Sequence, residues 1–173
     1  MKKILITDGM DKEFIYRLTN LGFEVLNKSC DENELIKLIS GFDVLIIRSK
    51  TKVNKDVLRK GKDGRLKLII RAGVWIDNIN VNFAEALGIT VKNTPNSSTN
   101  SVAELAMAHI FSVARFLGSS NYTMRNGEWN KKIYKGIEVL DKTLGIIGMG
   151  KIGLALGNKA ESLGMKIIYN DLG

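Results

Sequence analysis

The chain contains few of the residues that mark secreted, membrane or metal-binding proteins. It has one cysteine, Cys30, among 173 residues, so an intramolecular disulfide is excluded and a reducing compartment fits. No stretch approaches the roughly 18 consecutive apolar residues of a membrane-spanning helix. The start, Met1-Lys2-Lys3, leads into a short β-like segment without the pattern of a signal peptide. We therefore expect a cytoplasmic protein with no membrane partner.

Aromatic residues are also scarce, at 7% of the chain, and they do not alternate with the basic residues that give a net charge of +8. The densest basic stretch, residues 50–65, carries Val53, Val57 and Leu58 at helical spacing, which is typical of a solvated helix face. The sequence has neither a recognition-helix signature nor the spacing of a zinc site. These absences predict no nucleic-acid partner and no metal, and they leave the positive charge for anionic small molecules.

Residues 1–95 alternate short apolar runs with helical patterns, which is typical of an α/β fold. Strands are expected at 3–7, 23–26, 44–47, 66–71 and 89–93, and helices at 11–21, 31–40, 55–60 and 81–87. This alternation predicts a flavodoxin-like lobe whose parallel sheet is covered on both faces. Ligands bind outside the carboxyl ends of such strands, so the loops at 8–10, 48–51 and 72–78 are the candidate binding loops.

The only proline, Pro95, begins a polar segment that marks the expected boundary between two domains, 1–95 and 96–173. Ser101 and Glu104 then form the pattern of a capping box, which predicts a helix at 102–117. That helix is apolar nearly all round, so we expect it to be buried on every face, between domains or in a subunit interface. Residues 119–141 lack periodicity and are expected to form a connecting arm anchored by Trp129 and Tyr134.

Three glycines, Gly148, Gly150 and Gly153, follow an apolar run at 144–147 in the pattern G-x-G-x-x-G. In a dinucleotide-binding fold the first permits a tight turn, the second lets backbone approach a pyrophosphate, and the third lets the following helix lie close to the strand. A second strand at 165–169 leads to Asp171, 18 positions after Gly153. An acid at that point hydrogen-bonds the ribose of NAD and repels the extra phosphate of NADP. The pattern predicts NAD as cofactor, held by an incomplete Rossmann lobe that consists of its first β-α-β unit.

Four blocks of sequence, in consistent order along the whole chain, resemble the D-isomer-specific 2-hydroxyacid dehydrogenase family. They are RAGVWIDNI at 71–79, GITVKNTP at 88–95, SVAE at 101–104 and TLGIIGMGKIG at 143–153. The resemblance implies a substrate-binding lobe, then an interdomain helix and arm that help to form a homodimer, then an NAD-binding lobe. It also implies NAD-dependent oxidation or reduction of a small-molecule D-2-hydroxy acid, with 3-phosphoglycerate as the expected substrate. The helix at 102–117 and the arm after it are the expected dimer contacts.

The resemblance also implies roles for individual residues. Arg48 and Ser49 are placed near the charged end of the substrate, and the backbone amides around Gly73 and Val74 face its carboxylate. The residues implied to contact NAD, in addition to the three glycines of the turn, are Val74, Lys151, Ile152 and Asp171. Backbone donors in a glycine turn suit a carboxylate, and a guanidinium suits a carboxylate or a phosphate.

Two departures from the family pattern bear on activity. Trp75 stands where the family normally has glycine, so its indole could close the pocket, change the backbone or stack on a ligand. The family's catalytic arginine, glutamate and histidine come from a half that these 173 residues do not include. We therefore assign no catalytic residue and expect the chain to be inactive alone. His109, in the middle of the apolar helix, is expected to be a packed structural residue.

Simpler interpretations stay open for several of these residues. Arg48 could be a surface ion-pair partner, Asp171 a solvated acid, and the glycine turn a turn without nucleotide. The chain could also be a non-catalytic module that binds nucleotide or dimerises without turnover. A signalling receiver is disfavoured, because Asp8 lacks an adjacent acid and the third strand ends in Arg48 where a receiver has its phosphoacceptor aspartate.

Overall fold

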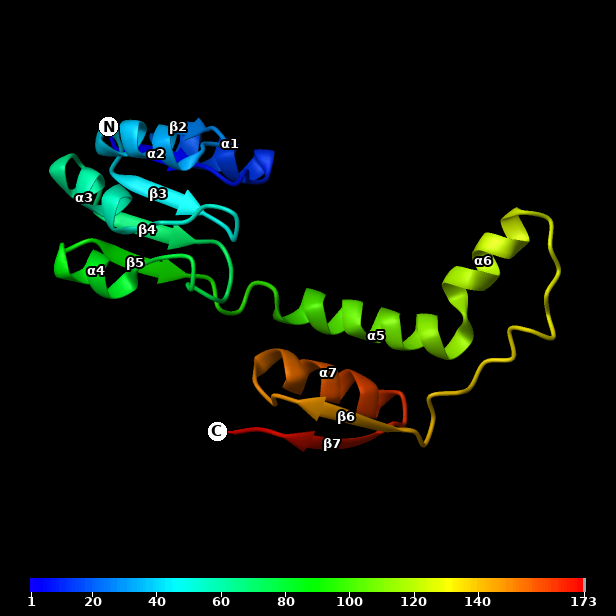
Figure 1. The fold of residues 1–173 in the computed structure, drawn as a ribbon. Helices are drawn as coiled ribbons and strands as arrows, with labels where there is room; N and C mark the ends of the chain where they lie inside the picture. Colours follow the sequence, from blue (N-terminus) through cyan, green and yellow to red (C-terminus); the bar gives the residue numbers. More distant parts are fainter. Residues whose placement is uncertain (173) are drawn as a thin grey trace. The chain divides into compact units, whose positions relative to one another are not determined.

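The computed structural model describes residues 1–172 of the chain. The chain forms two compact units, one comprising Met1–Ser97 and the other beginning at Ser98 (Figure 1). Each unit has its own hydrophobic core. The binding loops of each unit are therefore positioned by the packing of that unit.

The first unit is a five-stranded parallel sheet with the strand order β2-β1-β3-β4-β5. Its strands are β1 (Lys3–Ile6), β2 (Glu24–Asn27), β3 (Val44–Ile47), β4 (Leu68–Arg71) and β5 (Thr90–Asn93). Its helices are α1 (Lys12–Asn20), α2 (Glu32–Leu38), the short 3-10 helix η1 (Ile39–Gly41), α3 (Lys55–Asp63) and α4 (Val81–Ala86). This strand order is that of flavodoxin-like folds, so the predicted fold class is confirmed.

Both faces of the sheet are covered by helices. Successive residues of each strand point to opposite sides, so each strand contributes to a cluster on either face. Leu5 and Leu45 pack on one side with Leu58 of α3, within a large cluster that also includes residues of α2 and α4. Ile4 and Ile46 pack on the other side, against α1. The strands are thus buried on both faces, which explains their nearly continuous apolar sequences.

Side-chain caps set the starts of the helices that follow β2 and β3. Asp31 accepts the Glu34 N–H at 2.8 Å at the start of α2, and Asn54 accepts two N–H groups of α3, both at 3.1 Å. These caps satisfy donors that the first turn of a helix leaves without an intrahelical partner. They fix the points at which the loops at the carboxyl edge of the sheet end.

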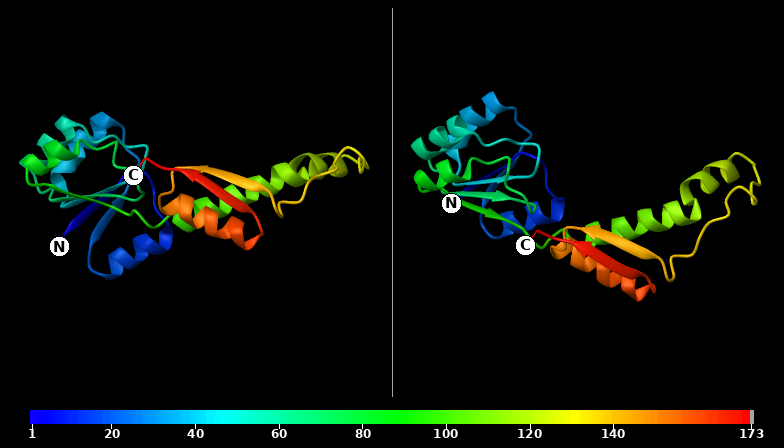
Figure 2. Two further views of the ribbon diagram at one scale, coloured as in Figure 1. Left: turned by 90° about the horizontal axis from the view of Figure 1, so that it is seen from below. Right: turned by 60° about the horizontal axis from the view of Figure 1, so that its bottom comes forward.

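The second unit consists of three helices and a parallel pair of strands within the described residues. In chain order they are α5 (Thr99–Arg115), α6 (Leu117–Arg125), β6 (Thr143–Ile147), α7 (Lys151–Ser162) and β7 (Lys166–Asn170). α7 packs against both α5 and the β6–β7 pair (Figure 2). The core between them centres on Met107, Ala160 and Met165. The glycine motif therefore lies between a strand and a helix, as its sequence predicts.

The start of α5 differs from the prediction. The helix begins at Thr99, and the capping box predicted from Ser101 and Glu104 is wrong. Ser98 occupies the cap position without a side-chain capping bond, and the Glu104 carboxylate instead accepts a hydrogen bond from the Asn100 side chain at 2.7 Å. An S-x-x-E pattern inside a helix looks the same in sequence as one that opens it.

The segment predicted as a connecting arm is partly helical. Phe116 adopts a left-handed conformation (φ 55°, ψ 34°) that ends α5, and α6 then extends to Arg125. Tyr134 anchors the remaining arm, because its hydroxyl lies 3.2 Å from Thr123 Oγ1 and its ring centroid 6.0 Å from that of Phe116. Trp129 is 75% exposed, so the expectation that it anchors the arm is wrong.

α5 buries only one face within the chain. Ala103 and Met107 are buried, whereas Leu105 is 57% and Val113 78% exposed, so the expected burial on every face is not met inside a single copy. In the described part of the chain, no single helix is long and apolar enough to cross a membrane. By length and composition alone, α5 and α6 together pass that test across a 63° bend.

Candidate functional site

The three loops predicted to bind ligand meet at the carboxyl edge of the first sheet and are hydrogen-bonded to one another. Asp8, after β1, accepts the Arg48 N–H at 2.7 Å and the Thr51 N–H at 3.1 Å. Its other carboxylate oxygen accepts the Thr51 hydroxyl at 2.5 Å. The loop after β3 is therefore tied to the loop after β1.

Asn78, in the loop after β4, donates hydrogen bonds to backbone carbonyl groups of the same segment. Its side-chain N–H₂ donates to the carbonyl oxygens of Arg48 at 2.8 Å and Thr51 at 2.7 Å. The backbone carbonyl of Asn78 in turn accepts a hydrogen bond from the Val53 N–H at 2.8 Å. Residues 48–51 are thus fixed at both ends by groups from two other loops.

The carboxylate of Asp8 is electrostatically adapted to this role. Partial burial alone raises its pKa, but hydrogen bonds from the Thr51 side chain and from the backbone of Thr51, Arg48 and Lys50 outweigh burial and leave the pKa below its ordinary value. Beneath it, the buried hydroxyls of Thr7 and Thr51 lie 2.8 Å apart. Asp8 is therefore ionised at neutral pH and accepts hydrogen bonds.

Arg48 and Ser49, the predicted substrate contacts, are both exposed at this edge. Ser49 lines an open hollow of about 680 Å³ together with Asp77, Asn78 and Asn80. Among residues 1–172 Arg48 forms no salt bridge, so its guanidinium is available for an anion. The structure gives no support to the simpler interpretation of Arg48 as an ion-pair residue.

The Gly73–Val74 turn is the predicted site for the substrate carboxylate. Hydrogen bonds to the carbonyl groups of both residues fix its backbone. The Gly73 carbonyl accepts the Thr94 N–H at 3.0 Å, and the Val74 carbonyl accepts the Asn93 side chain at 2.5 Å. The Gly73 N–H donates within the turn to the Arg71 carbonyl at 2.9 Å. Among the described residues the Val74 N–H has no backbone acceptor, so it is free to donate to a ligand.

Arg71 is a cation at this turn that the sequence pattern did not single out. A Cβ placed on Gly73 would lie 1.6 Å from Arg71 Nη1, so the guanidinium rests against the glycine. The buried Arg71 Nε has no partner among the described residues. Arg71 ends β4 within the RAG block, and its position directly before a glycine turn is the signal that would have identified it.

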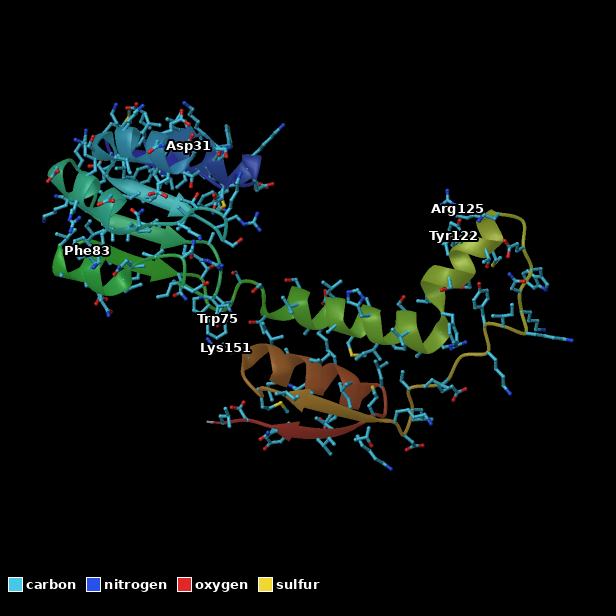
Figure 3. The ribbon with its side chains drawn as sticks, in the orientation of Figure 1. Asp31, Trp75, Phe83, Tyr122, Arg125 and Lys151 are labelled. Atoms are coloured by element: carbon cyan, nitrogen blue, oxygen red, sulfur yellow. The ribbon has the colours of Figure 1, made fainter. Side chains whose placement is uncertain are left out.

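Trp75 projects from the loop after β4 and is 76% exposed (Figure 3). Within residues 1–172 the non-glycine residues with positive φ are Phe116 and Asp141, so the backbone of Trp75 is of an ordinary kind. The chain therefore accommodates this large side chain without left-handed strain. Trp75 directly follows Val74 in the chain, and its side chain is largely open to solvent.

In the second unit, the turn between β6 and α7 requires glycine at two of its three glycine positions. Gly148 adopts a φ of 91°, which favours glycine. A Cβ on Gly153 would lie 2.3 Å from the Gly148 carbonyl oxygen, so only glycine lets α7 approach the end of β6 this closely. A Cβ on Gly150 would meet nothing within 4 Å, which leaves open space at the start of α7. Gly150, the N-cap residue of α7, has no side chain with which to cap the helix, and helix starts of this kind suit a phosphate.

Asp171 lies against the same turn. Its carboxylate accepts a hydrogen bond from the Met149 N–H, between the first two glycines. Lys151 and Ile152 begin α7, where Lys151 is exposed and Ile152 is half-buried. The structure thus brings together all the predicted NAD contacts of this unit, and these residues fit the ribose and pyrophosphate of the cofactor.

His109 is exposed on α5, so the expectation that it is packed is wrong within a single chain. It borders an apolar hollow of about 410 Å³ lined by residues such as Val113, Val139 and Met165. Across residues 1–172 no three His, Cys, Asp or Glu side chains are arranged to hold a metal ion.

Comparison with known proteins gives a consistent family. The family model described as D-isomer specific 2-hydroxyacid dehydrogenase, catalytic domain, matches residues 4–165. The chain is 44% identical over 170 residues to a hydroxypyruvate reductase from Thermotoga maritima, covering 98% of the chain and 55% of that protein. It is 42% identical over 171 residues to a D-3-phosphoglycerate dehydrogenase from Methanocaldococcus jannaschii, covering 99% of the chain and 32% of that protein.

Solved structures agree with this family. The TT0316 protein from Thermus thermophilus superimposes with a TM-score of 0.91 at 28% identity, over 99% of the chain and 56% of that protein. An NAD⁺-bound 3-phosphoglycerate dehydrogenase from Entamoeba histolytica gives a TM-score of 0.76 at 30% identity, over 99% of the chain and 54% of that protein. An acyclic imino acid reductase (Bsp5) in complex with NADPH and D-Arg gives 0.82 at 31% identity, over 96% and 55%. The chain therefore spans from 32% to 56% of the length of these proteins.

Proposed function

The chain belongs to the D-isomer specific 2-hydroxyacid dehydrogenase family, and we propose that it supplies the substrate-binding lobe and the first β-α-β unit of the NAD lobe of such an enzyme. The lobes divide near residue 95, at the polar segment after β5. The observation that carries the proposal is the placement of Asp171 against the Met149 N–H of the glycine turn, because this pair marks a dinucleotide site.

The cofactor is NAD rather than NADP. Asp171 presents a carboxylate where the adenosine ribose binds, and this carboxylate accepts ribose hydroxyls but repels a ribose phosphate. Gly148 and Gly153 shape the turn, Gly150 leaves room for the pyrophosphate, and the start of α7 supplies backbone amides. Lys151 and Ile152, at the start of α7, complete the contacts of this unit.

The substrate is a D-2-hydroxy acid, with 3-phosphoglycerate as the proposed compound. The Val74 N–H and Arg71 lie at one turn and suit the carboxylate, while Arg48 and Ser49 lie on the neighbouring loop and suit a second charged group. A substrate with an anionic group at each end matches two separate cationic positions. The chain is similar to proteins named phosphoglycerate dehydrogenase and hydroxypyruvate reductase, which supports the use of 3-phosphoglycerate and hydroxypyruvate as probes.

The chain of 173 residues binds these compounds but does not turn them over alone. NAD supplies a hydride acceptor for the C2 hydrogen of the hydroxy acid, and a protein base must take the hydroxyl proton. At the carboxyl edge of the first sheet, Asp8 is unsuited to this role, because its oxygens already accept hydrogen bonds from Arg48 and Thr51. The protein is cytoplasmic. It forms a homodimer that buries the exposed apolar face of α5, which includes Leu105 and Val113.

Calorimetry and an absorbance assay test this function together. We expect NAD⁺ to bind more tightly than NADP⁺, and we expect no NADH production from 3-phosphoglycerate by the 173-residue chain. Equal binding of the two cofactors would contradict the role of Asp171, and measurable turnover would contradict the claim that the base lies elsewhere.

A further inference from the structure

We propose that Asp8 and Asn78 are positioning residues that hold the backbone of residues 48–51 in the form that presents Arg48 and Ser49 to the substrate. This inference rests on the proposed function of that loop. Neither residue is among the predicted substrate contacts. Their hydrogen bonds go to the loop backbone and to the Thr51 hydroxyl, so they act on the substrate through the loop.

The two side chains make complementary hydrogen bonds to the loop. Asp8 is an acceptor, and it takes the N–H groups of Arg48 and Thr51. Asn78 is a donor, and its N–H₂ group gives one hydrogen bond to the carbonyl of each of the same two residues. Four backbone groups, at the first and last positions of a four-residue loop, are thereby fixed.

Such an arrangement goes beyond what stability of the sheet needs. β1 and β3 are already joined by backbone hydrogen bonds along their length, and the loop starts only after β3 has ended. A loop held at both ends in advance loses less conformational freedom when ligand binds, so its binding groups act at a lower entropic cost. The exposed side chains of Arg48 and Ser49 are the parts of the loop that this arrangement leaves for a ligand.

The chain offers a matched control at the opposite edge of the same sheet. Asp43 precedes β3, and its carboxylate accepts the Lys3 N–H at 2.7 Å and forms a salt bridge with Arg65 at 2.9 Å. Like Asp8, it has a lowered pKa, here caused first by the hydrogen bond from the Lys3 backbone. Asp43→Asn therefore removes a comparable carboxylate without touching residues 48–51.

The test is an NMR titration of the full 173-residue chain with 3-phosphoglycerate and, separately, with hydroxypyruvate. We expect Asp8→Asn and Asn78→Asp each to weaken binding about tenfold, because the first loses charge-assisted hydrogen bonds and the second loses both of its donor bonds to the loop. In the same variants the Arg48 and Thr51 amides should exchange faster with solvent. Thr51→Ser, which keeps the hydroxyl, should bind like the wild type, whereas Thr51→Val should bind less tightly. Asp43→Asn should keep wild-type affinity even if it lowers the melting temperature.

Wild-type affinity in Asp8→Asn, or an equal loss in Asp43→Asn, would overturn the positioning role while leaving the proposed function intact. Failure of the wild-type chain to bind either acid would instead contradict the proposed function itself, and the positioning role would fall with it.

Discussion

The carboxylate of Asp171 accepts a hydrogen bond from the Met149 N–H, although the two residues are 22 positions apart in the chain. The parallel pairing of β6 with β7 creates this contact, because it places the end of β7 beside the turn that follows β6. The strand pairing therefore places this carboxylate at the turn where we propose that the cofactor binds.

Replacing Asp171 should change cofactor preference. Asp171→Asn removes the negative charge, so the affinity for NADP⁺ should rise relative to that for NAD⁺, and Asp171→Ala should weaken NAD⁺ binding about tenfold. Calorimetric titration with both cofactors measures the ratio. Glu161→Gln is the control, since Glu161 is an exposed acid on α7. An unchanged ratio in Asp171→Asn would count against the assigned site.

Two glycines of α7 should differ sharply when replaced by alanine. A Cβ on Gly153 meets the Gly148 carbonyl oxygen at 2.3 Å, so Gly153→Ala should lower the free energy of unfolding by about 1–3 kcal/mol. A Cβ on Gly157 has an ordinary nearest contact of 3.5 Å, so Gly157→Ala should be neutral or stabilising by up to about 1 kcal/mol. Urea denaturation of the two variants gives the comparison, and equal stability would show that α7 is not pressed against the turn.

Gly150→Ala should separate stability from binding. Its Cβ meets no protein atom within 4 Å, so the melting temperature should stay close to that of the wild type. The added methyl group would occupy the space that we assign to the pyrophosphate, and NAD⁺ affinity should therefore fall about tenfold or more. Fluorescence titration with NADH checks the result; unchanged affinity would place the cofactor elsewhere.

Stability should depend on Asp8 at low pH. The pKa of Asp8 is lowered from 3.8 in the folded chain, so its contribution is complete above the unfolded pKa and is lost as the pH falls through the folded pKa. Between about pH 7 and pH 3, the wild type should lose more free energy of unfolding than Asp8→Asn. Chemical denaturation at several pH values measures the difference. Parallel plots of unfolding free energy against pH for the two proteins would contradict a stabilising role for the ionised Asp8 carboxylate.

Trp75 should report ligand binding by its fluorescence. Trp75 and Trp129 are the chain's two tryptophans, at 76% and 75% exposure, and only Trp75 adjoins the Val74 amide. Trp129→Phe should therefore keep the fluorescence change caused by 3-phosphoglycerate, and Trp75→Phe should abolish it. The opposite pattern would show that the acid binds away from the Gly73–Val74 turn.

The sequence contained enough information for the sheet and its binding edge. β1, β3 and β4 are short, nearly continuous apolar runs because both of their faces are buried, and loops at the carboxyl ends of such strands bind ligands. The glycine motif likewise predicted the turn between β6 and α7. The position of each turn follows from local chemistry that the sequence displays directly.

Contacts between distant loops could not be read in the same way. Asp8 reaches Arg48 across 40 positions because β1 pairs with β3, and strand order is not visible in the periodicity of either segment. α6 was missed because its sequence, LGSSNYTMR, has no apolar repeat at helical spacing. The exposed face of α5 was missed because composition shows that a helix is apolar but not what covers it.

The most direct test of the account is NMR chemical-shift mapping of the 173-residue chain with NAD⁺ and 3-phosphoglycerate added separately. We predict that NAD⁺ shifts the amides of residues 148–153 and Asp171, and that 3-phosphoglycerate shifts those of residues 48–49 and 73–75. No shifts in either group, or shifts confined to other parts of the chain, would contradict the assignment of a substrate lobe followed by the first part of an NAD lobe.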